Sequence, residues 1–146
     1  MTHINHKEIL NKSNAAKLSD APVIRFMNHY VISLRDNYTL KSTIDAFRIN
    51  HISGAPVVDH RNIVIGIISE YDLLIQAASK SLMSPIEFNT NVISVLPETT
   101  LKEVLINLYK KKLKWMPVVD KDNYLQGIVA RIDVLNFIAE NSEKVS

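Results

Sequence analysis

Two segments of the chain repeat each other at a constant spacing. Residues 55–59 read Ala-Pro-Val-Val-Asp, and 61 positions later residues 116–120 read Met-Pro-Val-Val-Asp. At this offset residues 31–74 align with residues 92–135 without a gap, and 15 of the 44 aligned positions are identical. An internal duplication constrains a fold strongly, because both copies must adopt the same structural unit. The chain is therefore predicted to contain two copies of one unit.

Each copy shows the same order of predicted elements, namely strand, helix, strand, strand and helix. Apolar residues at helical spacing, such as Ile44 and Phe47, mark the first helix. Thr39 and Thr100 are placed as N-caps of these helices, and Thr100 with Glu103 has the spacing of a capping box. The predicted strands are 31–34, 57–58 and 64–68 in the first copy and 92–95, 118–119 and 125–129 in the second, and the last helices are 70–78 and 131–140.

A polar turn of four residues joins the second and third strands of each copy, at 59–62 and 120–123. Such a short connection predicts an antiparallel hairpin. A three-stranded sheet covered by two short helices has too small a core to be stable alone. Two copies packed sheet to sheet bury each other's apolar faces. The predicted fold is thus α+β, with a small three-stranded sheet and two helices in each copy and approximate two-fold symmetry between the copies.

Composition excludes several functional classes. The 146 residues are 47% hydrophobic and 22% charged, which is typical of a globular protein. The net charge of +2 does not indicate a nucleic-acid-binding protein, and the absence of Cys excludes disulfides and Cys-based metal sites. Neither a signal peptide nor a membrane-spanning run is found, so a cytoplasmic location without a membrane partner is predicted. No His spacing typical of metal ligands and no catalytic motif occurs, so no enzyme activity is expected.

The duplication also sets the expected boundaries. The predicted divisions are an N-terminal arm or helix (1–22), the first repeat (23–78), a connection (79–91), the second repeat (92–140) and a C-terminal tail (141–146). The stretch around Met83 in the connection resembles the stretch around Met27 at an offset of 56. This smaller offset predicts five extra residues before the first strand of the second copy.

The repeated motifs resemble those of cystathionine β-synthase (CBS) domains, which form tandem pairs called Bateman modules. The matching residues are Ser53-Gly54-Ala55-Pro56-Val57-Val58-Asp59, Gly66-Ile67-Ile68-Ser69-Glu70-Tyr71-Asp72, Met116-Pro117-Val118-Val119-Asp120, Gly127-Ile128-Val129-Ala130-Arg131-Ile132-Asp133, and the preludes at Met27 and Met83. The resemblance covers residues 23–140 and implies the fold predicted above, with ligand clefts between paired sheets. It also implies a stand-alone pair that forms a homodimer. Many such domains bind AMP, ATP, S-adenosylmethionine or cyclic dinucleotides and regulate an enzyme, channel or transporter.

Asp72 and Asp133 are the central candidates for ligand binding, and each lies in the first turn of a predicted helix. The resemblance implies that this Asp binds a ribose diol, and charged acceptors form the stronger hydrogen bonds. A structural interpretation is equally open, because Ser69 and Asp72 have the spacing of a capping box and acids are favoured in a first helical turn. The second copy has Ala130 in place of Ser69. Since Ala cannot cap, Asp133 is interpreted as more than a capping partner.

Ser69 is the better candidate for a phosphate contact, because free N–H groups at a helix start attract anions. The resemblance implies an Arg just before the Asp, but this chain has Tyr71 and Ile132 there. That difference argues against a triphosphate and leaves a monophosphate, a nucleoside-like ligand or an empty cleft. Arg131 either substitutes for the missing Arg or is a solvated surface residue.

The resemblance implies that Ser53, Gly54, Ala55 and Pro56 wall an adenine pocket. Gly54 allows close approach, and the backbone of Ala55 is placed to contact the base edge. In the second copy Met116 and Pro117 take these places. Trp115 precedes them, and it stacks on a base, closes the pocket, or belongs to the core or a dimer interface.

Lysines at 110, 111, 112 and 114 form the one strong cluster of charge. Cations after a helix are favoured by its dipole and stay hydrated, so the cluster is interpreted as a solvated face. Binding of a phosphate or a partner is the alternative interpretation.

The leading functional hypothesis is a regulatory module that senses an adenine nucleotide or related adenosyl ligand between the two repeats. It needs no cofactor and acts on a regulated protein that the sequence does not identify. The alternative is a structural or adaptor dimerisation protein with an unoccupied cleft. Strand and turn positions agree between the copies, whereas the pocket positions differ. One good cleft and one altered or blocked cleft are therefore expected.

Overall fold

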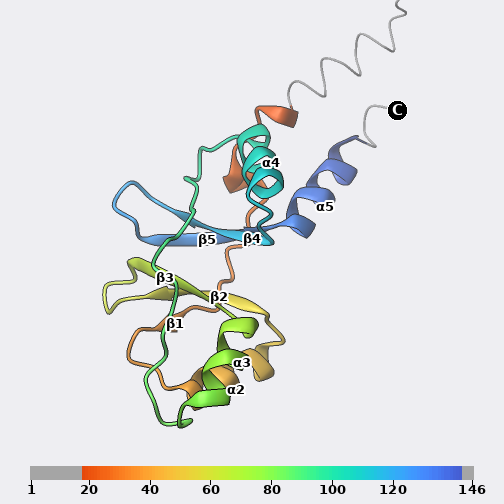
Figure 1. Ribbon diagram of the computed structural model, residues 1–146. Coiled ribbons are helices and arrows are strands. Elements are labelled where there is room, and N and C mark those ends of the chain that lie inside the picture. The colour runs from red at the N-terminus through yellow and green to blue at the C-terminus, as the bar shows by residue number, and fades with distance from the viewer. Residues whose placement is uncertain (1–17, 143–146) are drawn as a thin grey trace, which may run out of the picture. The chain divides into compact units, whose positions relative to one another are not determined.

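The computed structural model describes residues 18–142, and its elements follow the predicted order, except that the strand predicted at 92–95 is reduced to a bridge (Figure 1). They are η1 (Val23–Arg25), β1 (Leu34–Arg35), α2 (Leu40–Asn50), β2 (Gly54–Val58), β3 (Val64–Ser69), α3 (Glu70–Ser79), α4 (Leu101–Lys110), β4 (Trp115–Val119), β5 (Leu125–Ala130) and α5 (Arg131–Ser142). The first 17 residues of the predicted arm and the last four of the predicted tail lie outside the described residues.

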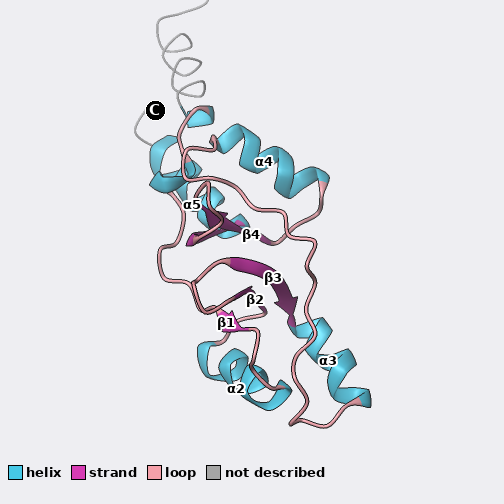
Figure 2. Ribbon diagram, turned by 90° about the vertical axis from the view of Figure 1, so that its left-hand side faces the viewer, coloured by secondary structure: helices cyan, strands magenta, loops and turns pink. Residues whose placement is uncertain are grey.

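In the first copy, β1, β2 and β3 form a three-stranded sheet. β1 is parallel to β2, with Leu34 opposite Val57, and β2 is antiparallel to β3, with Gly54 opposite Ser69. Both ribbon views place α2 and α3 on the same side of this sheet (Figure 2). Their buried apolar side chains form one cluster with those of the sheet: Leu34, Leu40, Phe47, Ala55, Val57, Ile68, Leu73 and Ile86.

The second copy has a smaller sheet. β4 and β5 form a two-stranded ribbon. The predicted strand at 92–95 is present as a single parallel bridge between Val95 and Val118, in which Val95 N–H donates to Pro117 O at 3.0 Å. This bridge is the counterpart, 61 positions later, of the pairing between Leu34 and Val57.

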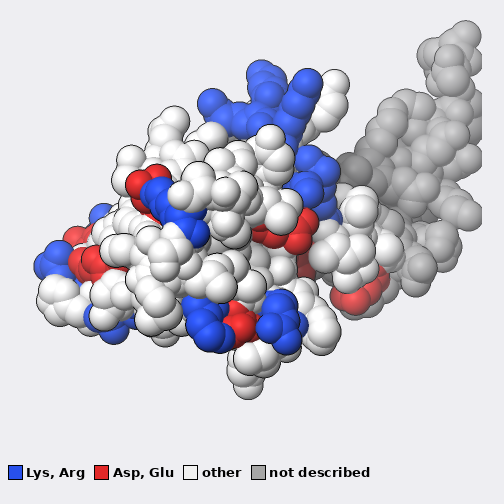
Figure 3. Space-filling view, turned by 60° about the horizontal axis from the view of Figure 1, so that its bottom comes forward, with Lys and Arg blue, Asp and Glu red and all other residues white. Residues whose placement is uncertain are grey.

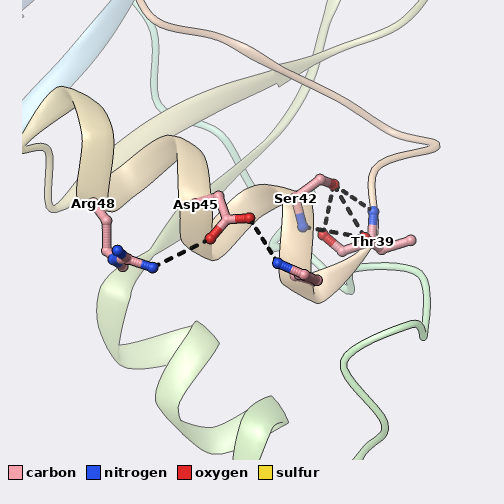
Figure 4. A network of polar contacts seen from close by, with 5 residues as sticks. Thr39, Ser42, Asp45 and Arg48 are labelled. Atoms are coloured by element: carbon pink, nitrogen blue, oxygen red, sulfur yellow. Dashed lines mark hydrogen bonds and ion pairs between the residues drawn. The ribbon is translucent and has the colours of Figure 1, made fainter.

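Thr39 caps α2 as predicted. Its Oγ1 accepts a hydrogen bond from Ser42 N–H at 3.2 Å, and Thr39 N–H donates to Ser42 Oγ at 3.0 Å (Figure 4). One turn further along the helix, Asp45 pairs with Lys41 at 3.1 Å and with Arg48 at 3.4 Å. These ion pairs are largely exposed, so each contributes little to stability. The closed cap, which satisfies two N–H groups at the helix start, is the stronger local determinant.

Thr100 caps α4 in the same way, with its Oγ1 accepting from Glu103 N–H at 3.3 Å. The return bond from the Thr100 N–H to the Glu103 side chain is not formed in the described residues. The capping box predicted here is therefore only half present, while Thr39 has a complete one built with Ser42.

Left-handed backbone recurs at matched positions of the two copies. His51 and Lys112, which follow the first helices, have φ of 52° and 53°, and Asn62 and Asn123 in the hairpin turns have φ of 68° and 70°. Asn adopts this conformation at lower cost than most residues, because its short side chain forms local hydrogen bonds. The recurrence of these conformations shows that both copies use the same turn geometry.

Asp59 organises the first hairpin turn. Its Oδ1 accepts from the N–H groups of Arg61 and Ile63 at 2.8 and 3.1 Å. Burial acts to raise the pKa of the Asp59 carboxyl, but these hydrogen bonds and the charges of Arg61 and His60 lower that pKa below its ordinary value. Asp120 makes the equivalent backbone contacts in the second copy. The repeated Asp is thus required by the turn.

The segment that precedes the first strand of each copy packs on the last strand of the other copy. Asn28 exchanges two backbone hydrogen bonds with Ile128 of β5, at 2.7 and 2.9 Å. Asn89 exchanges two with Ile67 of β3, at 2.9 and 3.0 Å. The described chain accordingly divides into an α2–α3 unit (30–94 and 119–126) and an α4–α5 unit (18–29, 95–118 and 127–142). Each compact unit is built from both copies.

This hydrogen bonding corrects one prediction. Asn28 and Asn89 are equivalent, because they are 61 positions apart and their partners, Ile128 and Ile67, are also 61 positions apart. Met27 therefore corresponds to Phe88 and not to Met83, so the five extra residues predicted for the second copy are wrong. The likeness around the two Met residues is a short sequence match, whereas the backbone pairing decides which residues are equivalent.

Gly66 and Gly127 lie where these segments cross the strands. A Cβ atom at Gly66 would lie 2.9 Å from Asn89 O, and one at Gly127 would lie 2.8 Å from Asn28 O and 3.0 Å from Met27 Sδ. Because backbone oxygens in a paired segment cannot move aside without breaking their hydrogen bonds, these two positions require glycine.

The variants Gly66→Ala and Gly127→Ala are each expected to lower the free energy of unfolding by about 1–3 kcal/mol, because overpacking displaces the paired segment. Urea denaturation of the purified chain measures this change. Gln126→Ala, at an exposed position beside Gly127, is the control and is expected to change stability by about 0.5 kcal/mol or less. Alanine variants that unfold at the wild-type urea concentration would contradict the close approach.

Candidate functional site

The end of the β2–β3 hairpin brings together two of the segments predicted to form a site. Gly54 of β2 lies opposite Ser69 at the end of β3. The first residue of α3 donates its N–H to Ser53 O at 2.9 Å, which ties the start of β2 to the start of the helix. Ser53 is exposed and Gly54 is half-buried, whereas Ala55 and Pro56 are buried. Of these four residues, Ser53 and Gly54 are therefore the ones that a ligand can reach from solvent.

Asp72 and Ser69 hold each other at the N-terminus of α3. Asp72 Oδ2 accepts from the N–H and from the hydroxyl of Ser69, each at 2.9 Å, and Ser69 Oγ accepts from Asp72 N–H at 3.2 Å. The capping box that the spacing indicated is thus confirmed. Within the described residues no hydrogen bond reaches Asp72 Oδ1. The box fixes the carboxylate in place and leaves one of its oxygens available.

Asp72 also lines a surface hollow of about 370 Å³ in the α2–α3 unit. The hollow is bordered by Asp72, Ile75, Gln76, Glu87, Phe88 and Asn89. Its lining combines carboxylates, amides and an aromatic ring, which are groups that can hydrogen-bond hydroxyls and stack on a planar ring.

Gln76 is a residue of this hollow that the sequence analysis did not identify. It is buried, with its Nε2 donating to Glu87 O and its Oε1 accepting from Glu87 N–H, both at 2.8 Å. The amide therefore holds the segment 87–89 beside Asp72. A polar residue three positions after the buried Leu73, on the core face of α3, was the available signal.

The second copy lacks half of this arrangement. Asp133 Oδ2 accepts from Ala130 N–H at 2.8 Å, but Ala130 has no hydroxyl to return the bond. The interpretation that Asp133 must do more than cap is therefore weakened, because the carboxylate caps the backbone N–H without help from a side chain. Arg131 is exposed, and its Nε donates to Leu113 O at 2.7 Å. Arg131 is thus anchored to the loop after α4.

Met116 and Pro117 are buried in β4, and the exposed fraction of Met116 is 0%. Trp115 is only partly buried. Met116 and Pro117 are thus buried in the same way as Ala55 and Pro56, their counterparts in the first copy.

An aromatic ring stands in the second copy where Gln76 stands in the first. Phe137, 61 positions after Gln76, packs its ring on Phe26 with a centroid distance of 4.9 Å. The guanidinium of Arg25 lies 5.2 Å from the centre of the Phe137 ring. The incoming segment is held here by apolar and cation–π contacts instead of by an amide. The buried amide that holds the incoming segment beside Asp72 is therefore specific to the first copy.

Within residues 18–142, no cluster of three or more His, Asp or Glu side chains could hold a metal ion. Over the same residues, no helix is both long enough and apolar enough to cross a membrane.

The family model of the CBS domain matches residues 21–78 and again residues 80–140, so the chain belongs to the CBS-domain family and carries a tandem pair of these domains. A curated relative is the carnitine transport ATP-binding protein OpuCA of Listeria monocytogenes, which is 29% identical over 127 residues, or 86% of this chain and 32% of the relative. The chain spans only about a third of the length of this relative.

Solved CBS pairs have the same fold. A putative acetoin utilization protein (AcuB) from Vibrio cholerae is 32% identical, with a TM-score of 0.76 over 86% of this chain and 94% of its own. CbpB in complex with c-di-AMP has a TM-score of 0.79 at 16% identity, covering 92% and 95% of the two chains. CBSX2 in complex with AMP has a TM-score of 0.72 at 22% identity, covering 82% and 96%.

Removing a hydroxyl at the N-terminus of α3 and adding one at the N-terminus of α5 are expected to have opposite effects on stability. Ser69→Ala is expected to lower the free energy of unfolding by about 1 kcal/mol, since it removes the acceptor for Asp72 N–H. Ala130→Ser is expected to raise it by about 0.5–1 kcal/mol, since it completes the box with Asp133. Urea denaturation of both variants beside the wild-type chain measures the changes. A loss of stability in Ala130→Ser would show that the second helix start cannot form the box.

Proposed function

We propose that this chain is a regulatory module that binds an adenine nucleotide or a related adenosyl ligand through its first-copy site. The observation that carries the proposal is the Asp72 carboxylate, which Ser69 holds in place and which borders a surface hollow. Solved CBS pairs that hold AMP or c-di-AMP support the ligand class. A CBS pair is a regulatory and not a catalytic module, and we propose no enzyme activity for the chain.

The chemistry assigns a role to each group. Asp72 Oδ1 accepts hydrogen bonds from a ribose diol, while Oδ2 remains in the capping box. The positive end of the α3 dipole favours the negative charge of a phosphate at this helix start. The Ser69 hydroxyl donates to that phosphate by turning its hydrogen away from Asp72 Oδ2. Ser53 and Gly54 border the adenine, with the backbone of Ala55 and Pro56 behind them. No Arg precedes Asp72, so a ligand with one phosphate per adenosine fits better than a triphosphate.

The second-copy residues Met116, Pro117 and Asp133 are proposed to form an altered site. Ala130 offers no hydroxyl, and the place equivalent to Gln76 is filled by the ring of Phe137. We propose that ligand binding at the first site shifts the population of conformations of the pair. A regulated protein in the cytoplasm then recognises the favoured conformation.

Thermal unfolding with AMP, ATP or c-di-AMP tests this function. At a concentration about 100 times the Kd, a bound ligand is expected to raise the Tm by about 5 °C or more. Asp72→Asn keeps an oxygen for the cap but loses the charge, and it is expected to abolish the rise. Asp133→Asn is the matched control, and it is expected to retain the rise.

Two outcomes would overturn the proposal. The first is an unchanged Tm of the wild-type chain with all three nucleotides. The second is a rise that persists in Asp72→Asn and disappears in Asp133→Asn, which would move binding to the second copy.

A second candidate function is that of an adaptor or dimerisation protein. The observation that favours it is a group of exposed apolar side chains on α3, in which Tyr71 is 67%, Leu74 68% and Ile75 54% exposed. Apolar patches of this kind mark interaction surfaces. In this alternative the chain acts as a homodimer through α3 and binds no nucleotide.

Sedimentation velocity over a range of protein concentrations tests this candidate. Leu74→Glu is expected to shift a dimer to monomer, because it places a charge in the apolar contact. Lys102→Glu, an exposed change on α4, is the control and should leave the dimer intact. A wild-type chain that stays monomeric at all concentrations would rule out dimerisation as the function.

A further inference from the structure

The hollow beside Asp72 has two walls, both within the α2–α3 unit. One wall is the face of α3 that carries Asp72, Ile75 and Gln76, which follow each other at helical spacing. The other wall is the segment 87–89, which enters from outside the first copy. The hollow keeps its shape only if this segment is fixed relative to the helix. The contacts that fix the segment therefore determine which groups face Asp72.

Three contacts hold this segment. Asn89 pairs with β3 through two backbone hydrogen bonds, at 2.9 and 3.0 Å. The ring of Phe88 fills the space that a side chain at Gly66 would occupy. The amide of Gln76 binds the backbone O and N–H of Glu87, each at 2.8 Å. This third contact comes from α3, so it ties the segment to the helix that forms the other wall.

The α4–α5 unit keeps the first two contacts and replaces the third. Its incoming segment pairs with β5 and lies over a glycine in the same way. At the positions of Gln76 and Glu87, however, it has Phe137 and Phe26, whose ring centroids are 4.9 Å apart. Apolar packing is therefore sufficient to hold a segment at this place, and the fold itself does not require an amide.

The amide also has a cost that apolar packing avoids. Gln76 is only 7% exposed, and a polar group in the core destabilises the fold unless hydrogen bonds replace its contacts with water. Both of its hydrogen bonds end on the backbone of Glu87, in the opposite wall of the hollow. A buried group that fixes the groups around a binding site, without need for it in the fold, is typical of a supporting residue of that site.

We propose that Gln76 is the positioning residue of the nucleotide site, and that the difference between Gln76 and Phe137 selects the first copy for binding. The amide acts through the backbone of Glu87, which keeps the segment 87–89 opposite Asp72. This inference rests on the proposed function, and it adds the residue that determines which copy carries that function.

The variant Gln76→Leu keeps a side chain of similar size and removes both hydrogen bonds. It is expected to weaken AMP binding to the folded chain by about tenfold or more, because the segment loses its attachment to α3. Isothermal titration calorimetry measures the Kd at a temperature where circular dichroism shows that every variant is folded, and urea denaturation measures stability separately. Phe137→Leu is the matched control in the second copy. It is expected to lower stability and to leave the Kd for AMP unchanged.

The variant Gln76→Glu separates positioning from packing. A protonated carboxyl has one O–H donor and one acceptor oxygen, as the amide does, whereas an ionised carboxylate has no donor for Glu87 O. Burial favours the protonated form, and so does a lower pH. The affinity of this variant for AMP, relative to that of the wild-type chain, is therefore expected to rise about tenfold between about pH 8 and about pH 5.5. A role in packing alone predicts a ratio that does not change with pH.

The surrounding charges do not produce this rise, because they are common to both chains. Asp72 and Glu87 line the hollow beside the substituted position, and Lys80 forms an ion pair with Glu87. Acidic and basic side chains are interspersed on the face of the molecule drawn in Figure 3, and they form no large acidic patch there. The titration of these groups, and of AMP itself, cancels in the ratio of the two affinities.

The outcomes separate this inference from the proposed function. AMP binding that Asp72→Asn abolishes and Gln76→Leu leaves unchanged would keep the site and overturn the role of Gln76. Equal losses of affinity in Gln76→Leu and Phe137→Leu would also overturn it, because both losses would then follow from stability. Where Gln76→Leu does not fold, a flat pH ratio for Gln76→Glu overturns the role and a rising ratio supports it. A wild-type chain that binds no AMP would overturn the assignment of the site to this nucleotide, and this inference with it.

Discussion

Both compact units depend on the backbone pairing of a segment that enters from outside the copy. Asn28 pairs with Ile128, and Asn89 pairs with Ile67, through two hydrogen bonds each. A small sheet with two helices has little core of its own, and the incoming segment enlarges it. The strands have glycine where the segment crosses them, at Gly127 and Gly66, because a side chain there would occupy the space of the segment. The duplication is therefore a structural requirement, since each copy supplies the segment that completes a unit containing the other copy's helices.

The two units share this scaffold but hold the segment by different chemistry. In the α2–α3 unit the buried amide of Gln76 binds both backbone groups of Glu87, which leaves a surface hollow beside Asp72. In the α4–α5 unit the rings of Phe137 and Phe26 pack together.

The sequence predicted features that depend on near neighbours in the chain. The offset of 61 positions, the caps at Thr39 and Thr100, the hairpins and the box between Ser69 and Asp72 all follow from local spacing. The crossing of segments did not follow, because backbone pairing between segments that are separate in the chain, such as Asn28 with Ile128, leaves no periodic signal, and a match of Met residues misplaced the equivalence. The role of Gln76 was missed because its side chain bonds the backbone of Glu87, and such a contact leaves no pattern of residue types. Asp133 caps the Ala130 N–H with its own carboxylate, and its role in ligand binding stays a prediction.

We propose that only one of the two equivalent positions carries the groups needed to bind a nucleotide. Native mass spectrometry of the intact chain in the presence of AMP tests this most directly, because it counts ligands per chain and reports the oligomer in the same spectrum. One AMP per chain is the expected result, and none on the Asp72→Asn variant. Two AMP per chain would show that the second copy binds as well as the first, and no bound AMP in the wild-type chain would contradict the assignment of the site to this nucleotide.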